Sequence, residues 1–194
     1  MHDVIATRRP PTIAVIGSHG VRKSTAVDGL LRAARGLGLD VATLGEVIRT
    51  SPLGHNEAAT PAAQLWVLAT QIAREVESGS GRELLVTDRS VVDNYAYYRR
   101  TAGDTDPFEV EPLIRTWAAG YALHLRLLAD VPLVADGFRS PNPGFRDAIE
   151  RLLDRIVPAF VPGERLVTMP ASEVTADRDW TAELRAWLHA PGGR

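Results

Sequence analysis

Short apolar runs alternate along the chain with longer segments in which apolar residues recur every three or four positions. The runs predict five strands, at residues 13–16, 41–44, 84–86, within 125–134 and at 166–169. Short apolar runs bounded by turn residues are typical of strands buried on both faces, and the segments between them have helical spacing. Strands that alternate with helices form a parallel sheet covered on both sides. We therefore predict an α/β fold of three layers, with a five-stranded parallel sheet flanked by helices.

Local signals indicate where three of the helices begin. Thr60 before Pro61 is typical of an N-cap followed by proline in the first turn. Ser90 and Asp93 have the spacing of a capping box, although Asp93 could also contact a substrate. A further helix is predicted to start within residues 106–109. The helix after Pro61 is expected to bury an apolar stripe of Leu65, Leu68, Ala69, Ile72 and Val76.

Composition limits the kind of protein that this chain can be. Its 194 residues suit one domain, which we place at residues 12–190 after a flexible tail of residues 1–11. No apolar run approaches the ~20 residues of a membrane span. The chain contains no cysteine, which excludes disulfides and thiolate metal sites and makes a cytoplasmic location the default. A net charge of −2 gives no general attraction for nucleic acid. Whether the protein is a monomer or a homodimer stays open.

The segment TIAVIGSHGVRKST, residues 12–25, has the pattern of a phosphate-binding loop between a strand and a helix. The pattern G-x-x-x-x-G-K-[ST] is met by Gly17, Lys23 and Ser24. Of the 22 basic residues 21 are arginine, so Lys23 is the only lysine, and its compact ammonium suits the β- and γ-phosphates. The predicted nucleotide contacts are Gly17, Ser18, His19, Gly20, Val21, Arg22, Lys23, Ser24 and Thr25.

Arg22 stands where the pattern requires its second glycine. Glycine there lets backbone N–H groups approach phosphate without a Cβ, so a long side chain could clash or distort the loop. Alternatively, the guanidinium points outward and leaves the loop usable. We expect Arg22 to weaken nucleotide binding, because backbone access is harder to replace than charge.

Two carboxylates follow other predicted strands. Glu46 comes just after the strand at residues 41–44, and Asp88 ends the apolar run at 84–86. Ligands of open parallel sheets bind beyond the carboxyl ends of the strands, so both residues should share one rim with Gly17. An aspartate that ends an apolar strand has the position of a Walker B residue, which binds the water shell of Mg²⁺.

Five segments together resemble the P-loop kinases related to nicotinamide riboside kinase, a group with AAA-type ATPase character, and more distantly the deoxynucleoside and thymidylate kinases. The segments are GSHGVRKST, GEVIRTSP, AAQLW, LLVTDRSVVDNYAYY and DGFRSPNPGFRDAIERLLDRI. The resemblance covers most of residues 12–160. It implies ATP as donor, Mg²⁺ as cofactor, and an arginine-bearing lid around residues 137–147.

The resemblance also implies roles for single residues. Lys23 would bridge the β- and γ-phosphates, Ser24 and Asp88 would hold the magnesium, and Glu46 would orient or deprotonate an acceptor hydroxyl. Arg139 and Arg146 would close over the transferring phosphoryl group. Substrate contacts are expected from Glu46, Arg49, Arg89 and Tyr95. Structural alternatives stay open for several of them: Glu46 could cap or pair with Arg49, Arg89 could pair with Asp88 or Asp93, and both lid arginines could be surface residues.

Rival interpretations differ in what they require of the sequence. A GTPase needs an N/T-K-x-D motif, but the only lysine lies in the loop. A dinucleotide-binding domain needs G-x-G-x-x-G, and Gly17 to Gly20 has the wrong spacing. We predict a P-loop kinase that transfers phosphoryl groups from ATP to a small hydroxyl-bearing acceptor, such as a nucleoside or nucleotide-like metabolite. The alternative is a catalytically impaired nucleotide-binding module that regulates or binds a partner.

Overall fold

The computed structural model of the chain describes residues 9–134 and 140–189. Its centre is a five-stranded sheet in which every neighbouring pair is parallel. The strand order is β2-β3-β1-β4-β5. The strands are β1 (Thr12–Ile16), β2 (Val41–Leu44), β3 (Leu84–Asp88), β4 (Leu123–Leu128) and β5 (Leu166–Pro170). The predicted α/β fold with five parallel strands is therefore confirmed.

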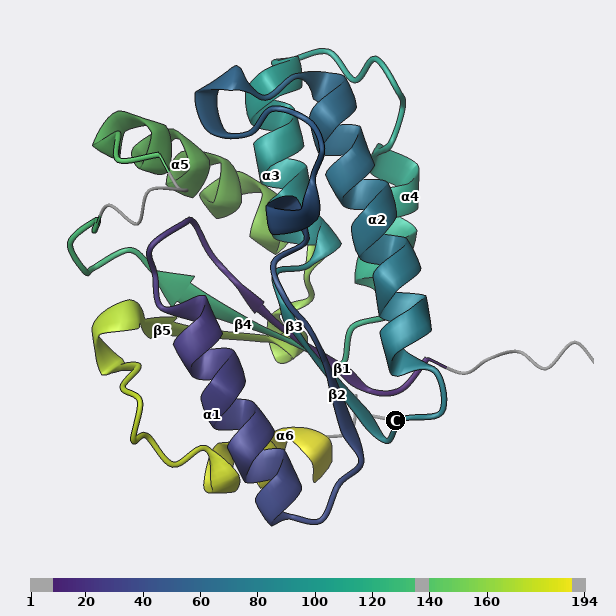
Figure 1. The fold of residues 1–194 in the computed structure, drawn as a ribbon, viewed down its shortest axis with the longest axis vertical. Coiled ribbons are helices and arrows are strands. Elements are labelled where there is room, and N and C mark those ends of the chain that lie inside the picture. Colours follow the sequence, from purple (N-terminus) through teal and green to yellow (C-terminus); the bar gives the residue numbers. More distant parts are fainter. Residues whose placement is uncertain (1–8, 135–139, 190–194) are drawn as a thin grey trace, which may run out of the picture.

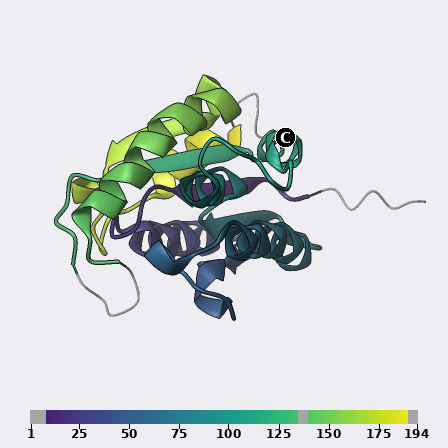
Figure 2. The same ribbon diagram turned by 90° about the horizontal axis from the view of Figure 1, so that it is seen from above.

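Helices cover both faces of the sheet (Figure 1). They are α1 (Lys23–Gly36), α2 (Pro61–Gly79), α3 (Val91–Ala102), α4 (Glu111–Ala118), α5 (Pro143–Phe160) and α6 (Thr181–His189). Helices α1 and α6 pack on one face, and α2 to α5 pack on the other. Figure 2 looks onto the layer formed by α2 to α5, in which α3 lies between α2 and α5.

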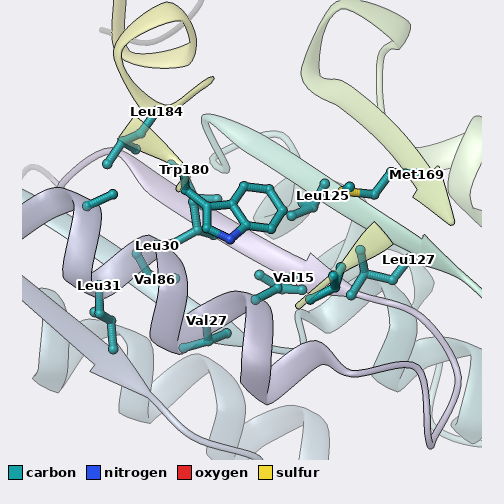
Figure 3. Packing of buried hydrophobic residues seen from close by; sticks show 14 of the residues in the cluster. Val15, Val27, Leu30, Leu31, Val86, Leu125, Leu127, Met169, Trp180 and Leu184 are labelled. Carbon is teal, nitrogen blue, oxygen red and sulfur yellow. The ribbon is translucent and has the colours of Figure 1, made fainter. Parts of the chain in front are cut away.

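Strand β1 supplies side chains to both cores, because successive residues of a strand point to opposite faces. Ile13 and Val15 join the core under α1 and α6, whereas Ala14 and Ile16 join the core under α2 to α5. Figure 3 shows the first core, in which the indole of Trp180 packs beside Leu30. A Cβ on Gly29 would lie 2.6 Å from that indole, so α1 needs glycine there to let Trp180 approach.

Two predicted boundaries were wrong. The fourth strand spans Leu123–Leu128 instead of lying within 125–134, because the N–H of Asp130 turns back to bond the carbonyl of Leu128. The helix predicted to start within 106–109 begins at Glu111. Glu109 has a left-handed φ of 49°, and the carboxylate of Asp106 accepts hydrogen bonds from Tyr98 Oη and the N–H of Glu111. Asp106 therefore caps the helix from outside it.

Helix α2 begins where predicted, with Thr60 as its N-cap, but its buried stripe differs from the expected one. Ala69 and Val76 are exposed, while Gln64, Gln71 and Glu75 are buried. The carboxylate of Glu75 accepts four hydrogen bonds, from Gln71, Arg9, Trp117 and Tyr121, at 2.6–3.0 Å. These five residues, here called the Glu75 cluster, satisfy the buried carboxylate of Glu75.

The described part of the predicted tail, residues 9–11, is packed against the domain. Arg9 forms an ion pair with Glu75 at 3.0 Å and lies over the ring of Trp117 at 3.9 Å.

The capping box of Ser90 and Asp93 at the start of α3 is confirmed. Among the described residues, no helix is long and apolar enough to span a membrane.

Candidate functional site

The loop between β1 and α1 has the close-packed backbone that the glycine pattern predicts. Gly17 has a φ of 145°, and a Cβ on it would lie 2.6 Å from the carbonyl oxygen of Leu127, so only glycine fits. Lys23 is the first residue of α1 and is 3% exposed. Its Nζ donates to the carbonyl oxygen of Ser18 at 2.5 Å, inside the loop. The loop thus curls around the ammonium at the positive end of a helix dipole.

Arg22 takes a left-handed conformation, with φ 59° and ψ 26°, that favours glycine. Its side chain is exposed, and Nη1 donates to the carbonyl oxygen of Val174 at 3.0 Å. The guanidinium therefore reaches across to the segment after β5. Of the two arrangements weighed for Arg22, the structure has the outward one. Its effect on nucleotide affinity stays a prediction.

Ser24 and Asp88 meet at the carboxyl ends of β1 and β3. Asp88 pairs in register with Val15, and Ser24 Oγ donates to Asp88 Oδ2 at 2.6 Å. The second oxygen, Asp88 Oδ1, is buried and has no hydrogen-bond partner within residues 9–134 and 140–189. A carboxylate oxygen left open beside a hydroxyl fits the ligand chemistry of Mg²⁺, which keeps several waters and needs few protein ligands.

No group of three or more His, Asp or Glu side chains that could hold a metal ion occurs among the described residues. A magnesium ion here would therefore depend on Ser24, Asp88, water and phosphate oxygens. That is the usual coordination of magnesium bound together with a nucleotide.

Arg89 lies between two carboxylates behind the loop. Its Nη2 is 2.7 Å from Glu46 Oε1, and its Nη1 is 3.1 Å from Asp93 Oδ2. The same Nη1 donates to the carbonyl oxygen of Gly17 at 3.4 Å. Arg89 has a left-handed φ of 88°, which its own N–H stabilises by donating to Val15 at 2.9 Å. The guanidinium thereby joins the loop after β1, the segment after β2 and helix α3.

Burial shifts the pKa values of charged side chains around Arg89. The pKa of Lys23 is lowered from 10.5 to about 8, chiefly by burial and also by the positive charge of Arg89, while Asp88 and Glu46 oppose the change. Burial also raises the pKa of Asp93, against the opposing effect of Arg89. The two buried cations, Lys23 and Arg89, are thus surrounded by the three carboxylates of Glu46, Asp88 and Asp93.

A small cavity opens beside this group. Four of its polar side chains were not among the predicted contacts: Asn56, Gln64 from α2, and Asn94 and Tyr97 from α3. The other lining residues are His19, Glu46, Ile48, Val67 and Arg89. One sequence signal could have revealed Gln64, since Gln64, Gln71 and Glu75 recur on one face of α2 in place of apolar residues.

The other predicted residues lie in different places. Tyr95 is outside the cavity: it stacks on Tyr98 at 5.9 Å between ring centroids, and its hydroxyl donates to Glu111. Arg49 pairs with Glu46 at 3.1 Å while remaining exposed. Arg146 in the first turn of α5 donates to the carbonyl oxygen of Val131 at 3.0 Å. Arg139 and the centre of the predicted lid lie outside the described residues.

The structure places the remaining loop residues as follows. Val21 is part of the core under α1, and Ser18 donates its N–H to Glu150 Oε1 of α5 at 3.2 Å. The ring of His19 lies 5.6 Å from that of Phe145. Gly20 has a φ of 78°, and Thr25 is half-buried in the first turn of α1.

Comparisons with known proteins identify similar folds and no similar sequence. No known protein family and no curated protein matches the sequence. Two structures of NadR, one with NAD and AMP-PNP and one with NR, align over 96% of this chain with TM-scores of 0.65 and 0.66 at 18% and 19% identity. The chain spans about half of those chains, 51% and 52%.

Thymidylate kinase from Candida albicans aligns over 93% of this chain and 91% of its own, with a TM-score of 0.59 at 13% identity. At these identities the likeness establishes the fold and leaves the activity to be argued from the site. The fold expected from the resemblance is confirmed: this chain has a P-loop kinase-like fold.

Proposed function

We propose that the protein transfers the γ-phosphoryl group of ATP to a hydroxyl of a small acceptor, such as a nucleoside or nucleotide-like metabolite. One observation carries the proposal: the 2.6 Å contact between Ser24 and Asp88, with Asp88 Oδ1 buried and unpartnered among the described residues, lies at the rim that also holds Lys23. A purely structural pair has no need of an open carboxylate oxygen.

On the donor side, the loop from Gly17 to Thr25 would hold the phosphates with its N–H groups. Lys23 would release Ser18 and neutralise the β- and γ-phosphates. Ser24 and Asp88 would hold magnesium, which when bound neutralises phosphate charge. Phosphoryl transfer depends mainly on positioning and charge neutralisation, and this rim supplies both.

On the acceptor side, Glu46 and Arg89 line the cavity next to Lys23. Glu46 accepts from Arg89 through Oε1 and from Arg49 through Oε2, at 2.8 and 3.1 Å. A carboxylate held by two guanidinium groups is a poor proton acceptor, so we assign Glu46 to orienting the hydroxyl. The amides of Gln64 and Asn94 and the hydroxyl of Tyr97 would bind the remaining polar groups of the acceptor.

Arg146 and Arg139 complete the proposal as residues that approach the transferring phosphoryl group. Arg146 supports this in one respect. It belongs to the first turn of α5, where the helix dipole disfavours a cation, so a nearby anion would compensate. For Arg139 the support is its position just before α5 in the sequence.

The test is acceptor-dependent formation of ADP with ATP·Mg²⁺ and a panel of nucleosides and nucleotides. We expect turnover with at least one acceptor, and a loss of about 10²–10³-fold in Asp88→Asn. Asp28→Asn is the matched control, because Asp28 is exposed on α1 one turn after Ser24. Binding of ATP without turnover by any acceptor would contradict the proposal and support the regulatory module instead.

A further inference from the structure

A second cleft lies apart from the loop, between α3, α4 and α5. It has a volume of about 870 Å³. Its apolar floor includes Leu152, Ile156 and Phe160, and five arginines line it: Arg99, Arg100, Arg115, Arg151 and Arg155. None of its lining residues lines the cavity beside Glu46. We call this feature the arginine cleft.

Positive charge is concentrated in the arginine cleft. Five of its 15 lining residues are arginine, whereas the whole chain has 21 arginines in 194 residues and a net charge of −2. The carboxylates of the cleft are Asp104, Glu111 and Asp154, which leaves an excess of two positive charges. The general abundance of arginine in this chain therefore does not account for the cleft.

Part of this charge is already neutralised. Glu111 pairs with Arg115 at 2.7 Å, and Asp154 pairs with Arg126, outside the cleft lining, at 2.6 Å. By contrast, Arg151 and Arg155 make no ion pair or hydrogen bond with the residues that the structure describes, and they stand about one turn apart on α5. Two guanidinium groups on one helix face thus keep their donors for a ligand.

From these observations we infer that the arginine cleft binds a small phosphate ester that carries an apolar ring. Guanidinium groups bind phosphate through paired donors, and neighbouring arginines suit its double charge. The floor of Leu152, Ile156 and Phe160 would contact the ring. The volume lies within the range of about 300–1,000 Å³ of small-molecule sites. A second anion site is thereby assigned to the chain, independent of the proposed phosphotransferase activity.

Phe145 separates the two sites. Its ring lies 5.6 Å from that of His19 on the loop side, and the guanidinium of Arg100 lies 5.8 Å from it on the cleft side. The arginine cleft is therefore a site of its own, and a ligand can be assigned to one site or the other by residue-resolved measurement.

The probe is phenyl phosphate, titrated into the full chain and followed by ¹H–¹⁵N NMR. We expect saturable shifts on residues 99–104 and 148–160, with a dissociation constant below about 1 mM. Arg151→Gln/Arg155→Gln should weaken this binding roughly tenfold or more, because it removes two charge-assisted contacts. The matched control is Arg35→Gln/Arg185→Gln, which removes the same charge from exposed positions on α1 and α6. It should leave the affinity unchanged.

Two further titrations test the ligand class. Inorganic phosphate should bind roughly tenfold more weakly than phenyl phosphate, and benzyl alcohol should give no saturable shifts. Shifts confined to residues 17–25, no saturable shift on α3 and α5, or equal weakening in both double variants would overturn the proposal. Benzyl alcohol binding as tightly as phenyl phosphate, or inorganic phosphate binding equally well, would overturn it as well.

Discussion

Two buried groups of charged side chains in this protein differ in how far the protein itself satisfies them. In the Glu75 cluster, each oxygen of one carboxylate receives two hydrogen bonds, from Gln71 and Tyr121 on one side and from Arg9 and Trp117 on the other. At the rim of the sheet, around Lys23, Glu46, Asp88 and Arg89, one carboxylate oxygen of Asp88 has no partner among the described residues.

The two groups are connected, which makes the difference informative. Gln71 donates from one Nε2 both to Glu75, at 2.9 Å, and to the carbonyl oxygen of Arg89, at 3.3 Å. A satisfied buried network makes its surroundings rigid, while an open polar atom in rigid surroundings is available to a ligand. The Glu75 cluster thus fits the role of a scaffold, and the rim fits that of the binding site proposed above.

The largest expected effect is on stability, from Glu75→Ala. This change leaves Arg9 as a partly buried charge and removes the partner of Trp117 and Tyr121. We expect a loss of about 3–5 kcal/mol in the free energy of unfolding, measured with urea. Glu77→Ala on the same helix is the control, because Glu77 is exposed and its ion pair with Arg74 is 3.8 Å long. Equal effects of both changes would show that the Glu75 cluster is not a scaffold.

Lys23→Met should reduce activity and not stability, in contrast to Glu75→Ala. Phosphoryl transfer should fall about 10²–10³-fold, because one preorganised positive charge is lost from the rim. Stability should stay the same or rise, since burial already penalises the ammonium and lowers its pKa to about 8. The measurements are turnover and thermal unfolding, with Arg35→Met as an exposed control of equal charge on α1. A large loss of stability in Lys23→Met alone would remove the distinction between rim and scaffold.

His124 is a buried polar residue that belongs neither to the Glu75 cluster nor to the rim, and it should make stability depend on pH. Neither ring nitrogen has a hydrogen-bond partner among the described residues, and burial lowers the pKa of His124 from 6.5 to about 3. The unfolded chain binds a proton below pH 6.5 and the folded chain does not, so stability falls as pH falls from 6.5 toward 3. Between pH 6.5 and 4.5 this residue should cost about 2 kcal/mol.

His124→Phe keeps the ring that contacts Tyr121 and removes the titration. Urea unfolding at several pH values should therefore show a flatter pH dependence in this variant than in the unchanged chain. His189→Phe, at an exposed position, should leave the slope as it is. Parallel pH profiles for the unchanged chain and His124→Phe would contradict the assignment of a buried neutral imidazole.

The smallest expected effect is that of Arg22→Gly. Glycine relieves the left-handed φ of 59°, but the guanidinium already points away from the loop toward Val174. We expect the affinity for ATP·Mg²⁺ to rise by less than about threefold, measured by calorimetric titration. Arg32→Gly, which removes another arginine that donates to a backbone carbonyl from α1, controls for the loss of such a contact. A gain of tenfold or more would show that Arg22 obstructs the loop.

The sequence by itself determined the features that depend on neighbouring residues. The order of strands and helices follows from local hydrophobic spacing, and the caps at Thr60 and Ser90 follow from side chains that bond their own helix ends. The strand-loop-helix unit around Gly17, Lys23 and Ser24 was equally predictable, because these residues lie within eight positions of one another. Asp88 could be placed at the rim because parallel strands end on the same side.

Only the tertiary structure decided which side chains meet across the fold. The polar residues on one face of α2 were visible in the sequence, but their partners were not. Those of Glu75 come from segments before β1 and β4, and those of Gln71 include the carbonyl oxygen of Arg89 and the amide of Asn94 on α3. Nor could the sequence show that Tyr97, and not Tyr95, lines the cavity. The two residues lie about half a turn apart on α3, and only packing against α5 fixes which of them faces the cavity. Burying a polar group is favourable only where it finds hydrogen-bond partners, and those partners come from segments that packing brings together.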